Sequence, residues 1–175
     1  MIFVETELPG AYLIELERRE DQRGYFARAW CEREFAVHGL ETRFVQVNLG
    51  HNLRRGTVRG MHFQRAPYAE VKLVRCTRGA LYDVIIDLRP ESPTYRRWIG
   101  VELSAANGRA LYVPRGFAHG YQTLEDNTDL MYQTSEFYVA EAARGVRYND
   151  PAFGIAWPLA VSLVSEADAN WQEYQ

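Results

Sequence analysis

Lysine and cysteine are scarce in this chain of 175 residues. Lys72 is the only lysine among 20 basic residues, and the two cysteines, Cys31 and Cys76, are too few for a disulfide framework. This cysteine usage excludes a disulfide-stapled secreted scaffold and leads us to expect a reducing, cytoplasmic setting. A net charge of -3 gives no bulk attraction to nucleic acid, so we expect no nucleic-acid partner.

Long hydrophobic runs are also missing. No apolar segment reaches the roughly 20 residues that cross a bilayer, which predicts no membrane partner. The stretch Met1–Glu5 becomes charged too early for a signal peptide, so we expect none. The hydrophobic content of 47% nevertheless suffices for one packed core. We therefore expect a single domain over residues 1–175.

Helix signals are few and strand signals dominate. Cys31–His38 is a short amphipathic stretch ended by Gly39, and Ser165 opens a Ser-x-x-Asp capping box. Two turn-rich sites, Arg78-Gly79 and Glu125-Asp126-Asn127, indicate hairpins. Many short strands at regular spacing favour a mainly β fold, a jelly-roll β-barrel with a few short helices. The expected strands are Tyr12–Leu16, Phe44–Leu49, Val71–Thr77, Ala80–Asp87, Trp98–Leu103, Ala110–Val113, Gly120–Thr123 and Leu130–Glu136.

Two windows of the chain carry the chemistry. The first begins at Gly56 and contains Arg-Gly-Met-His-Phe-Gln at 59–64, followed by Glu70 and Lys72; the second contains Pro-Arg-Gly-Phe-Ala-His at 114–119. This spacing resembles the paired cupin motifs, in which three imidazoles and a carboxylate hold one metal ion. Here Gln64 replaces the second histidine, and Glu70 sits slightly beyond the usual ligand spacing. We therefore expect no metal and no other cofactor, and instead an acid–base site.

A longer ordered set of motifs resembles one family over about residues 1 to 170. The set is Asp21-x-Arg23-Gly24-x-Phe26, Gln46-x-Asn48, the 59–64 motif, Lys72, Asp83-Val84, Asp87-Leu88-Arg89, Ser92-Pro93-Thr94, Gly116–Gly120, Tyr132, Tyr138, Asn149-Asp150-Pro151 and Ile155-x-Trp157-Pro158. It resembles the dTDP-4-dehydrorhamnose 3,5-epimerases, a metal-free branch of the cupins. The resemblance implies a nucleotide-diphosphate keto-sugar substrate and a homodimer whose subunits share site residues.

The family reaction inverts carbons beside a ketone, which requires a base, a stabiliser of the enolate oxygen, and an acid on the opposite face. His62 is the candidate base, since histidine ordinarily titrates near neutrality. Lys72 is the candidate enolate stabiliser, and Tyr132 the candidate acid. Asp168 matches the family carboxylate that orients the base, although it could instead only complete the capping box with Ser165.

Each of these residues also has a structural interpretation. His62 could be a hydrogen-bonded interior histidine, and Tyr132 could simply pack in the barrel. Lys72 could be an interior lysine paired with Asp83 or Glu70, because a buried ammonium needs a partner. The occurrence of all three in one family pattern favours the catalytic interpretation.

The substrate-binding residues predicted for the nucleotide sugar are Arg23, Phe26, Arg28, Gln46, Asn48, Arg59, His119 and Tyr138. Arg23 and Arg59 could grip a diphosphate through two hydrogen bonds each. Gln46 and Asn48 could contact phosphate or base, and Phe26 offers a flat face to a nucleobase. We expect His119 to hydrogen-bond the sugar or the ketone, with a structural role in the second motif as the alternative. The resemblance implies that Tyr138 stacks near the base or sugar, and that Arg23 and Phe26 reach a neighbouring subunit's site.

Arg28 and Ala167 are among the positions that depart from the family pattern. The family usually has a glutamate, thought to read thymine, where this chain has Arg28. Arginine only donates hydrogen bonds, which suits the acceptors of cytosine or guanine better than the N3–H of thymine, so a CDP- or GDP-sugar is an alternative. Ala167 replaces a lysine often found beside the carboxylate, which removes one possible phosphate contact.

Other functions remain open from the sequence. The first is an epimerase that inverts only C3 or C5. A metal-dependent cupin oxygenase is disfavoured by Gln64, and a non-catalytic sugar-nucleotide binding protein is disfavoured by the joint presence of His62, Lys72 and Tyr132.

Overall fold

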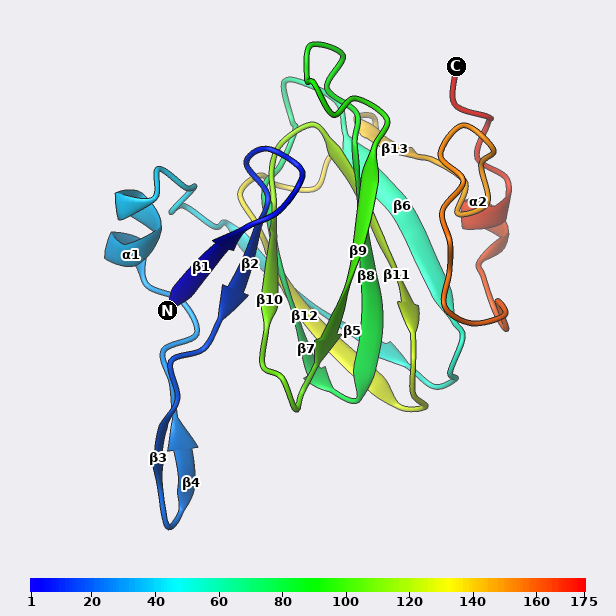
Figure 1. Cartoon of the computed structure of the whole chain (residues 1–175). Helices are drawn as coiled ribbons and strands as arrows, with labels where there is room; N and C mark the ends of the chain where they lie inside the picture. The colour runs from blue at the N-terminus through cyan, green and yellow to red at the C-terminus, as the bar shows by residue number, and fades with distance from the viewer.

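Two antiparallel sheets face each other and form the body of the protein (Figure 1). The computed structural model describes residues 1–175. The larger sheet has the strand order β1-β2-β10-β7-β12-β5, and the smaller has the order β13-β6-β11-β8-β9. The strands are β1 Ile2–Glu5, β2 Tyr12–Glu15, β3 Arg19–Asp21, β4 Gly24–Phe26, β5 Gln46–Asn52, β6 Val58–Gln64, β7 Lys72–Arg78, β8 Ala80–Asp87, β9 Trp98–Ser104, β10 Ala110–Val113, β11 Phe117–Thr123, β12 Thr128–Thr134 and β13 Ala143–Gly145; the helices are α1 Glu32–Val37 and α2 Glu166–Ala169. The expected jelly roll with few short helices is confirmed.

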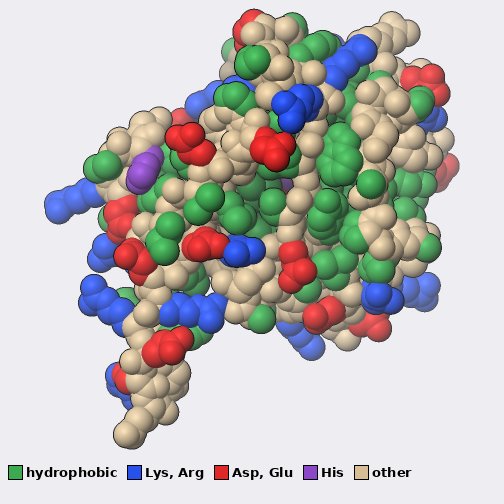
Figure 2. Space-filling model, viewed as in Figure 1, with side chains coloured by type: hydrophobic (Ala, Val, Ile, Leu, Met, Phe, Trp, Pro, Cys, Tyr) green, Lys and Arg blue, Asp and Glu red, His purple; other side chains and the backbone are tan.

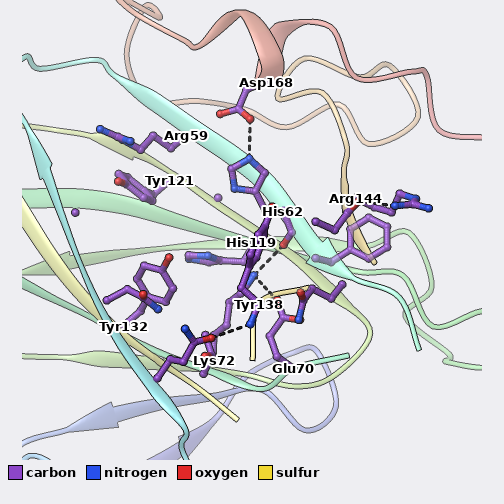
Figure 3. Close-up of a pocket in the computed structure, with 18 of the residues that line it drawn as sticks. Arg59, His62, Glu70, Lys72, His119, Tyr121, Tyr132, Tyr138, Arg144 and Asp168 are labelled. Atoms are coloured by element: carbon purple, nitrogen blue, oxygen red, sulfur yellow. Dashed lines mark hydrogen bonds and ion pairs between the residues drawn. The ribbon is translucent and has the colours of Figure 1, made fainter. Parts of the chain in front are cut away.

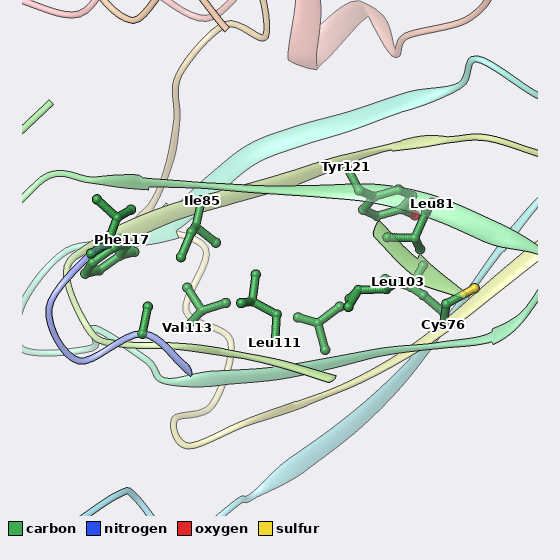
Figure 4. Close-up of a cluster of buried hydrophobic side chains, with 12 residues drawn as sticks. Cys76, Leu81, Ile85, Leu103, Leu111, Val113, Phe117 and Tyr121 are labelled. Carbon is green, nitrogen blue, oxygen red and sulfur yellow. The ribbon is translucent and has the colours of Figure 1, made fainter. Parts of the chain in front are cut away.

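The main core lies between the two sheets (Figure 4). Leu81 and Ile85 of β8 meet Val74 of β7 and Leu111 of β10 there, and all four are fully buried. Alternate residues of β8 point to opposite faces of the sheet, so Val84 and Ile86 join a second cluster on its outer side. Burial on both faces explains why β8 is almost continuously hydrophobic. Burial of each such large apolar side chain contributes about 1.5–3 kcal/mol to the free energy of folding.

Short segments cover the outer faces of the sheets. Phe35 of α1 is fully buried against Ile14 and Leu73 on the six-stranded sheet. On the other side, Val146 and Phe153 pack against the outer face of the five-stranded sheet. The chain segments that follow β13 therefore close this side of the barrel.

Both predicted turns exist, but neither closes a hairpin. Gly79 and Asn127 have positive φ angles of 70° and 53°, as tight turns require. However, β7 and β8, on either side of Gly79, belong to different sheets, and so do β11 and β12 around Asn127. The hairpin prediction was wrong because turn residues report a reversal of the chain, whereas the strand partner is chosen by distant contacts.

Strand β6, which carries the first motif, is absent from the sequence-predicted strands. The polar residues Arg59 and His62 and the flexible Gly60 mask the alternation that identifies a strand. Its hydrogen-bonded partners are β11 and β13, both far away in sequence. The short strands β1, β3, β4 and β13 were missed as well, and β11 begins three residues before the predicted Gly120.

The hairpin of β3 and β4 projects from the body and belongs to neither sheet (Figures 1 and 2). All six of its residues are exposed. Gly24 sits at its turn with a φ of 122°, which only glycine adopts readily. Neither of the two helices is long and apolar enough to cross a membrane.

Candidate active site

A pocket of about 590 Å³ lies between the two sheets. His62 and His119 enter it from the five-stranded sheet, and Lys72 and Tyr132 enter it from the six-stranded sheet (Figure 3). The predicted site residues that line it are Gln46, Asn48, Arg59, His62, Lys72, His119, Tyr132, Tyr138 and Asp168. Strand pairing explains part of this convergence, because His62 lies directly opposite His119 and Tyr132 directly opposite Asn48.

His62 and Asp168 form a hydrogen-bonded pair. The Nε2 atom of His62 lies 2.6 Å from Oδ1 of Asp168, whose other oxygen accepts the Gly60 backbone N–H at 3.1 Å. The Asp168 side chain is 8% exposed, whereas that of His62 is 50% exposed and faces the pocket. Burial alone would raise the pKa of Asp168, but the hydrogen bonds from His62 and Gly60 outweigh it and lower the pKa. The carboxylate therefore stays charged and holds the imidazole in one orientation.

Asp168 also takes part in the cap of α2, but through its backbone and not through its side chain. Its backbone N–H donates to Oγ of Ser165 at 3.1 Å, which is the N-cap interaction. Its carboxylate does not close a reciprocal box; it points to His62 instead. The cap thus fixes the start of a short helix whose third residue delivers a carboxylate to the pocket.

Lys72 is buried and paired with Glu70. Its Nζ lies 3.0 Å from Oε1 of Glu70 and donates to the backbone oxygen of His62 at 3.0 Å. The side chains of Lys72 and Glu70 are 10% and 7% exposed, and Oε2 of Glu70 has no hydrogen-bond partner. The partner expected as Asp83 or Glu70 is therefore Glu70. Two of the three ammonium hydrogens have partners, which leaves one for a pocket ligand.

His119 forms a second histidine–carboxylate pair, which sequence reasoning missed. Its Nε2 lies 2.8 Å from Oδ1 of Asp83, and both side chains are buried. Asp83 faces His119 because β8 and β11 are hydrogen-bonded neighbours. The alternation of β8 gave a usable signal, since Asp83 shares the inner face with Leu81 and Ile85 and needs a buried partner there.

Tyr132 lines the pocket from the six-stranded sheet, and Tyr121 lines it from the five-stranded sheet. Burial raises the pKa of Tyr132, so its phenol remains protonated at neutral pH. Burial also raises the pKa of Tyr121 to about 12, and the Tyr121 hydroxyl donates to Asn52 at 3.3 Å. Asn52 in turn accepts the Nε–H of Arg59 at 2.8 Å, which fixes this guanidinium at the edge of the pocket.

The family model for dTDP-4-dehydrorhamnose 3,5-epimerase matches residues 5–175 of this chain. A dTDP-4-dehydrorhamnose 3,5-epimerase of Sinorhizobium fredii is 44% identical over 171 residues, which are 97% of this chain and 88% of the relative. The chain belongs to the dTDP-4-dehydrorhamnose 3,5-epimerase family. The family resemblance predicted from the motifs is thereby confirmed.

Two further relatives differ in what their names say of the reaction. The crystal structure of the Bacillus anthracis dTDP-4-dehydrorhamnose 3,5-epimerase, with TDP and PPi bound, superposes with a TM-score of 0.95 at 40% identity and covers 99% of each chain. A dTDP-4-dehydrorhamnose 3-epimerase of Streptomyces niveus is 38% identical over 164 residues, which are 93% of this chain and 79% of the relative. Close relatives of this chain therefore include proteins named for two centres and for one.

In this epimerase, Gln64 stands where a metal-binding cupin has a histidine. Its side-chain amide forms hydrogen bonds with backbone groups. It donates to the carbonyls of Tyr68 at 2.9 Å and Phe137 at 3.1 Å, and accepts the N–H of Val139 at 2.6 Å. The two pocket histidines are each paired with their own carboxylate. The chain contains no group of three or more histidine, cysteine, aspartate or glutamate side chains that could hold a metal ion.

The predicted nucleotide-binding residues fall into two groups. Gln46, Asn48 and Tyr138 line the pocket, with the Tyr138 side chain exposed at its mouth. Those of the projecting region do not line it. Arg23 is bound to Asp21 at 2.6 Å with a 90% exposed side chain, Phe26 is 74% exposed, and Arg28 is bound to Glu34 at 2.8 Å. One chain of this epimerase therefore brings together all the predicted catalytic residues, but only some of the predicted substrate-binding residues.

Several pocket residues carried no sequence signal. Ala143, Arg144 and Trp171 also line the pocket. Trp171 packs so tightly on Gly145 that a Cβ there would lie 2.2 Å from the indole. This contact attaches the segment after α2 to β13, whose Gly145 lies directly opposite His62. Only the fold brings these distant segments together.

Proposed function

We propose that this protein is a cofactor-independent 3,5-epimerase of a nucleotide-linked 4-keto-6-deoxyhexose of the dTDP-4-dehydro-6-deoxyglucose type. The observation that carries the proposal is the His62–Asp168 pair facing Tyr132 across the pocket, in a chain of the epimerase family. A base and an acid on opposite sheets suit inversion, because the proton leaves one face of a carbon and returns to the other.

The proposed reaction needs only proton transfers. His62 removes the proton from a carbon next to the C4 ketone, and the C–H electrons move into an enolate. Asp168 stabilises the resulting imidazolium, as its lowered pKa supports. The remaining hydrogen of the Lys72 ammonium donates to the enolate oxygen. Tyr132 returns a proton to the opposite face, the ketone reforms, and solvent restores both protonation states.

The proposal covers two carbons, with a single-centre epimerase as the narrower alternative. The ketone at C4 acidifies the hydrogens at C3 and C5 alike, so one base can serve both after the sugar ring turns or flips. The Streptomyces niveus relative, named as a 3-epimerase, supports keeping the single-centre alternative. Proton exchange at C3 and at C5 can be measured separately, which distinguishes the two alternatives.

We further propose a homodimer in which the region of β3 and β4 completes the neighbouring subunit's site. Exposed Phe26 and Arg23 have the flat face and the charge that a nucleoside diphosphate needs, but lie outside their own pocket. Edge strand β5 leaves Val47 and Leu49 exposed by 59% and 79%, and exposed Leu53 follows it. An unpaired edge with apolar side chains favours association with a second copy.

The nucleobase is proposed to be thymine, as in the names of the relatives. Arg28 supports the alternative of a CDP- or GDP-linked sugar, because a guanidinium cannot accept the N3–H of thymine. Within its own chain Arg28 binds Glu34, which is also held by the N-terminal amine. Competition between dTDP, CDP and GDP for the pocket distinguishes the two, and much tighter binding of dTDP would rule out the alternative. The free cysteines support a proposed cytoplasmic location.

Solvent deuterium incorporation tests the proposed function. The protein is incubated in heavy water with dTDP-, CDP- and GDP-linked 4-keto-6-deoxyhexoses, and the signals of sugar C3 and C5 are followed by NMR. We expect deuterium at both carbons, lost in His62→Ala. Uptake at one carbon supports the single-centre alternative. No uptake with any substrate, combined with tight nucleotide binding, would instead support a non-catalytic sugar-nucleotide binding protein.

A further inference from the structure

The Gln64 side chain connects two loops at the mouth of the pocket. It is 7% exposed, and each end of its amide is engaged. The nitrogen donates to the carbonyl of Tyr68, in the loop after β6, and to the carbonyl of Phe137, in the segment after β12. The oxygen accepts the backbone N–H of Val139 at 2.6 Å. Gln64 therefore binds the backbone on both sides of Tyr138.

A second glutamine holds Tyr138 itself. The Oε1 atom of Gln46 accepts the backbone N–H of Tyr138 at 2.7 Å. Three consecutive residues thus have their backbone held by two side chains from β5 and β6. In contrast, Tyr138 as a whole is 69% exposed, and its hydroxyl has no hydrogen bond within the chain. The fixed backbone sets the position from which the free side chain can reach a ligand, so less backbone freedom is lost on binding.

The chemistry at position 64 requires an amide. Two donated hydrogen bonds and one accepted hydrogen bond match the carboxamide, which has two N–H groups and a carbonyl oxygen. A neutral imidazole has one donor and one acceptor, so histidine could not satisfy these three backbone groups. A leucine of similar size would leave them all unpaired in a buried place. The glutamine is therefore explained by the loops that it joins.

We propose that Gln64 is a positioning residue that, together with Gln46, fixes Tyr138 at the pocket mouth so that its ring can stack on the base of a bound nucleotide. The inference rests on the proposed function, since it takes a nucleotide as the ligand of this pocket. It deepens that function by giving Gln64 a role in affinity for the nucleotide half of the substrate. Base–aromatic stacking contributes about tenfold or more in affinity, which sets the size of the effect.

A double-mutant cycle with dTDP as the probe tests the proposal. The dissociation constant is measured by calorimetry for the wild type, Gln64→Leu, Tyr138→Ala and the double variant. We expect Gln64→Leu to weaken dTDP binding about tenfold in the wild-type background and to have little effect once Tyr138 is replaced. Equal weakening in both backgrounds, or none in either, would overturn the proposal.

Gln64→Glu is the second variant, in case the leucine variant does not fold. The ionised carboxylate keeps the acceptor for Val139 but loses both donors; when protonated it regains one donor. We expect dTDP affinity to recover as the pH falls in this variant relative to the wild type. A constant ratio of affinities across pH would contradict the role proposed for the donated hydrogen bonds.

Amide hydrogen exchange separates this proposal from the proposed function. We expect the Tyr138 and Val139 amides to be protected in the wild type and to exchange faster in Gln64→Leu, with β8 unchanged. If the wild type binds no nucleotide but these amides behave as expected, the nucleotide function fails while the positioning role stands. Unchanged exchange at both amides would overturn the positioning role whatever the ligand.

Discussion

The same three-residue motif, Asp-x-Arg, occurs at the end of β8 and on the β3–β4 hairpin, with very different surroundings. In both places the aspartate accepts the backbone N–H, the Nε and an Nη of the arginine two residues later. Asp87 is fully buried and also accepts hydrogen bonds from Ser92 and Thr94. Asp21 and its partner Arg23 lie in water. The same local hydrogen bonds therefore occur once in the buried interior of the barrel and once on the exposed hairpin.

This contrast extends to the site. Within the barrel, His62, Lys72 and His119 each have a carboxylate partner in the same chain. On the hairpin, Arg23 and Phe26 are exposed and do not line the pocket. The proposed catalytic groups are therefore assembled within one chain, whereas the nucleotide-binding residues proposed on the hairpin lie outside the pocket of their own chain.

Replacing His62 by alanine removes the proposed base from the barrel. We expect kcat for C3 and C5 inversion to fall about a thousandfold, within the range for general acid–base groups. His51→Ala is the matched control, because His51 also pairs with an aspartate, Asp129, but lies outside the pocket. Comparable losses in the two variants would show that His62 has no special role.

Lys72→Met removes the only lysine and leaves Glu70 as an unpaired buried carboxylate. We expect activity to fall about a hundredfold or more, and the free energy of unfolding to fall by about 3–5 kcal/mol. The double variant Lys72→Met/Glu70→Gln should recover most of the stability but none of the activity. Denaturant unfolding and kcat, measured together, check this, and recovered activity would exclude Lys72 from catalysis.

Asp87→Asn tests the scaffold side of the comparison. Burial alone would raise the pKa of Asp87, but the hydrogen bonds from Arg89, Ser92 and Thr94 lower it to about 2. Because the pKa in the folded state is below that in the unfolded chain, the stabilisation is complete above about pH 4 and is lost as the pH falls toward 2. We expect the variant to lose about 2 kcal/mol at neutral pH and less in acid.

Asp21→Asn is the matched control for that measurement. The hydrogen bonds from Arg23 also lower the pKa of Asp21, but both side chains are exposed. Solvent screening should leave the free energy of unfolding unchanged within error at every pH. A loss of stability equal to that of Asp87→Asn would contradict the distinction between scaffold and hairpin.

Arg23→Ala tests the hairpin side. We expect KM for the nucleotide sugar to rise about tenfold with a smaller change in kcat, because a phosphate contact binds ground state and transition state alike. Arg54→Ala provides the control, since Arg54 is an exposed arginine outside the pocket. Initial rates over a range of substrate concentrations check this, and similar KM values in the two variants would exclude a binding role for Arg23.

Sequence reasoning predicted those parts of the fold and site that depend on local pattern. The run of hydrophobic residues at 80–87 identified β8, and the glycine after Cys31–His38 identified the end of α1. It missed β6 and mistook two inter-sheet turns for hairpins, because strand partners depend on contacts between distant residues. The motif spacing found His62, Lys72 and His119, but not the pairing of His119 with Asp83.

The measurement that tests the division between barrel and hairpin most directly is subunit complementation. Arg23→Ala and His62→Ala chains are mixed one to one after unfolding and refolding, and deuterium uptake is followed at a substrate concentration below KM. In a twofold dimer with shared sites, each mixed dimer holds one site with both native residues, so about a quarter of all sites should be restored. We predict a rate several times above the sum of the separate variants. A rate equal to that sum would contradict a site completed by the neighbouring hairpin.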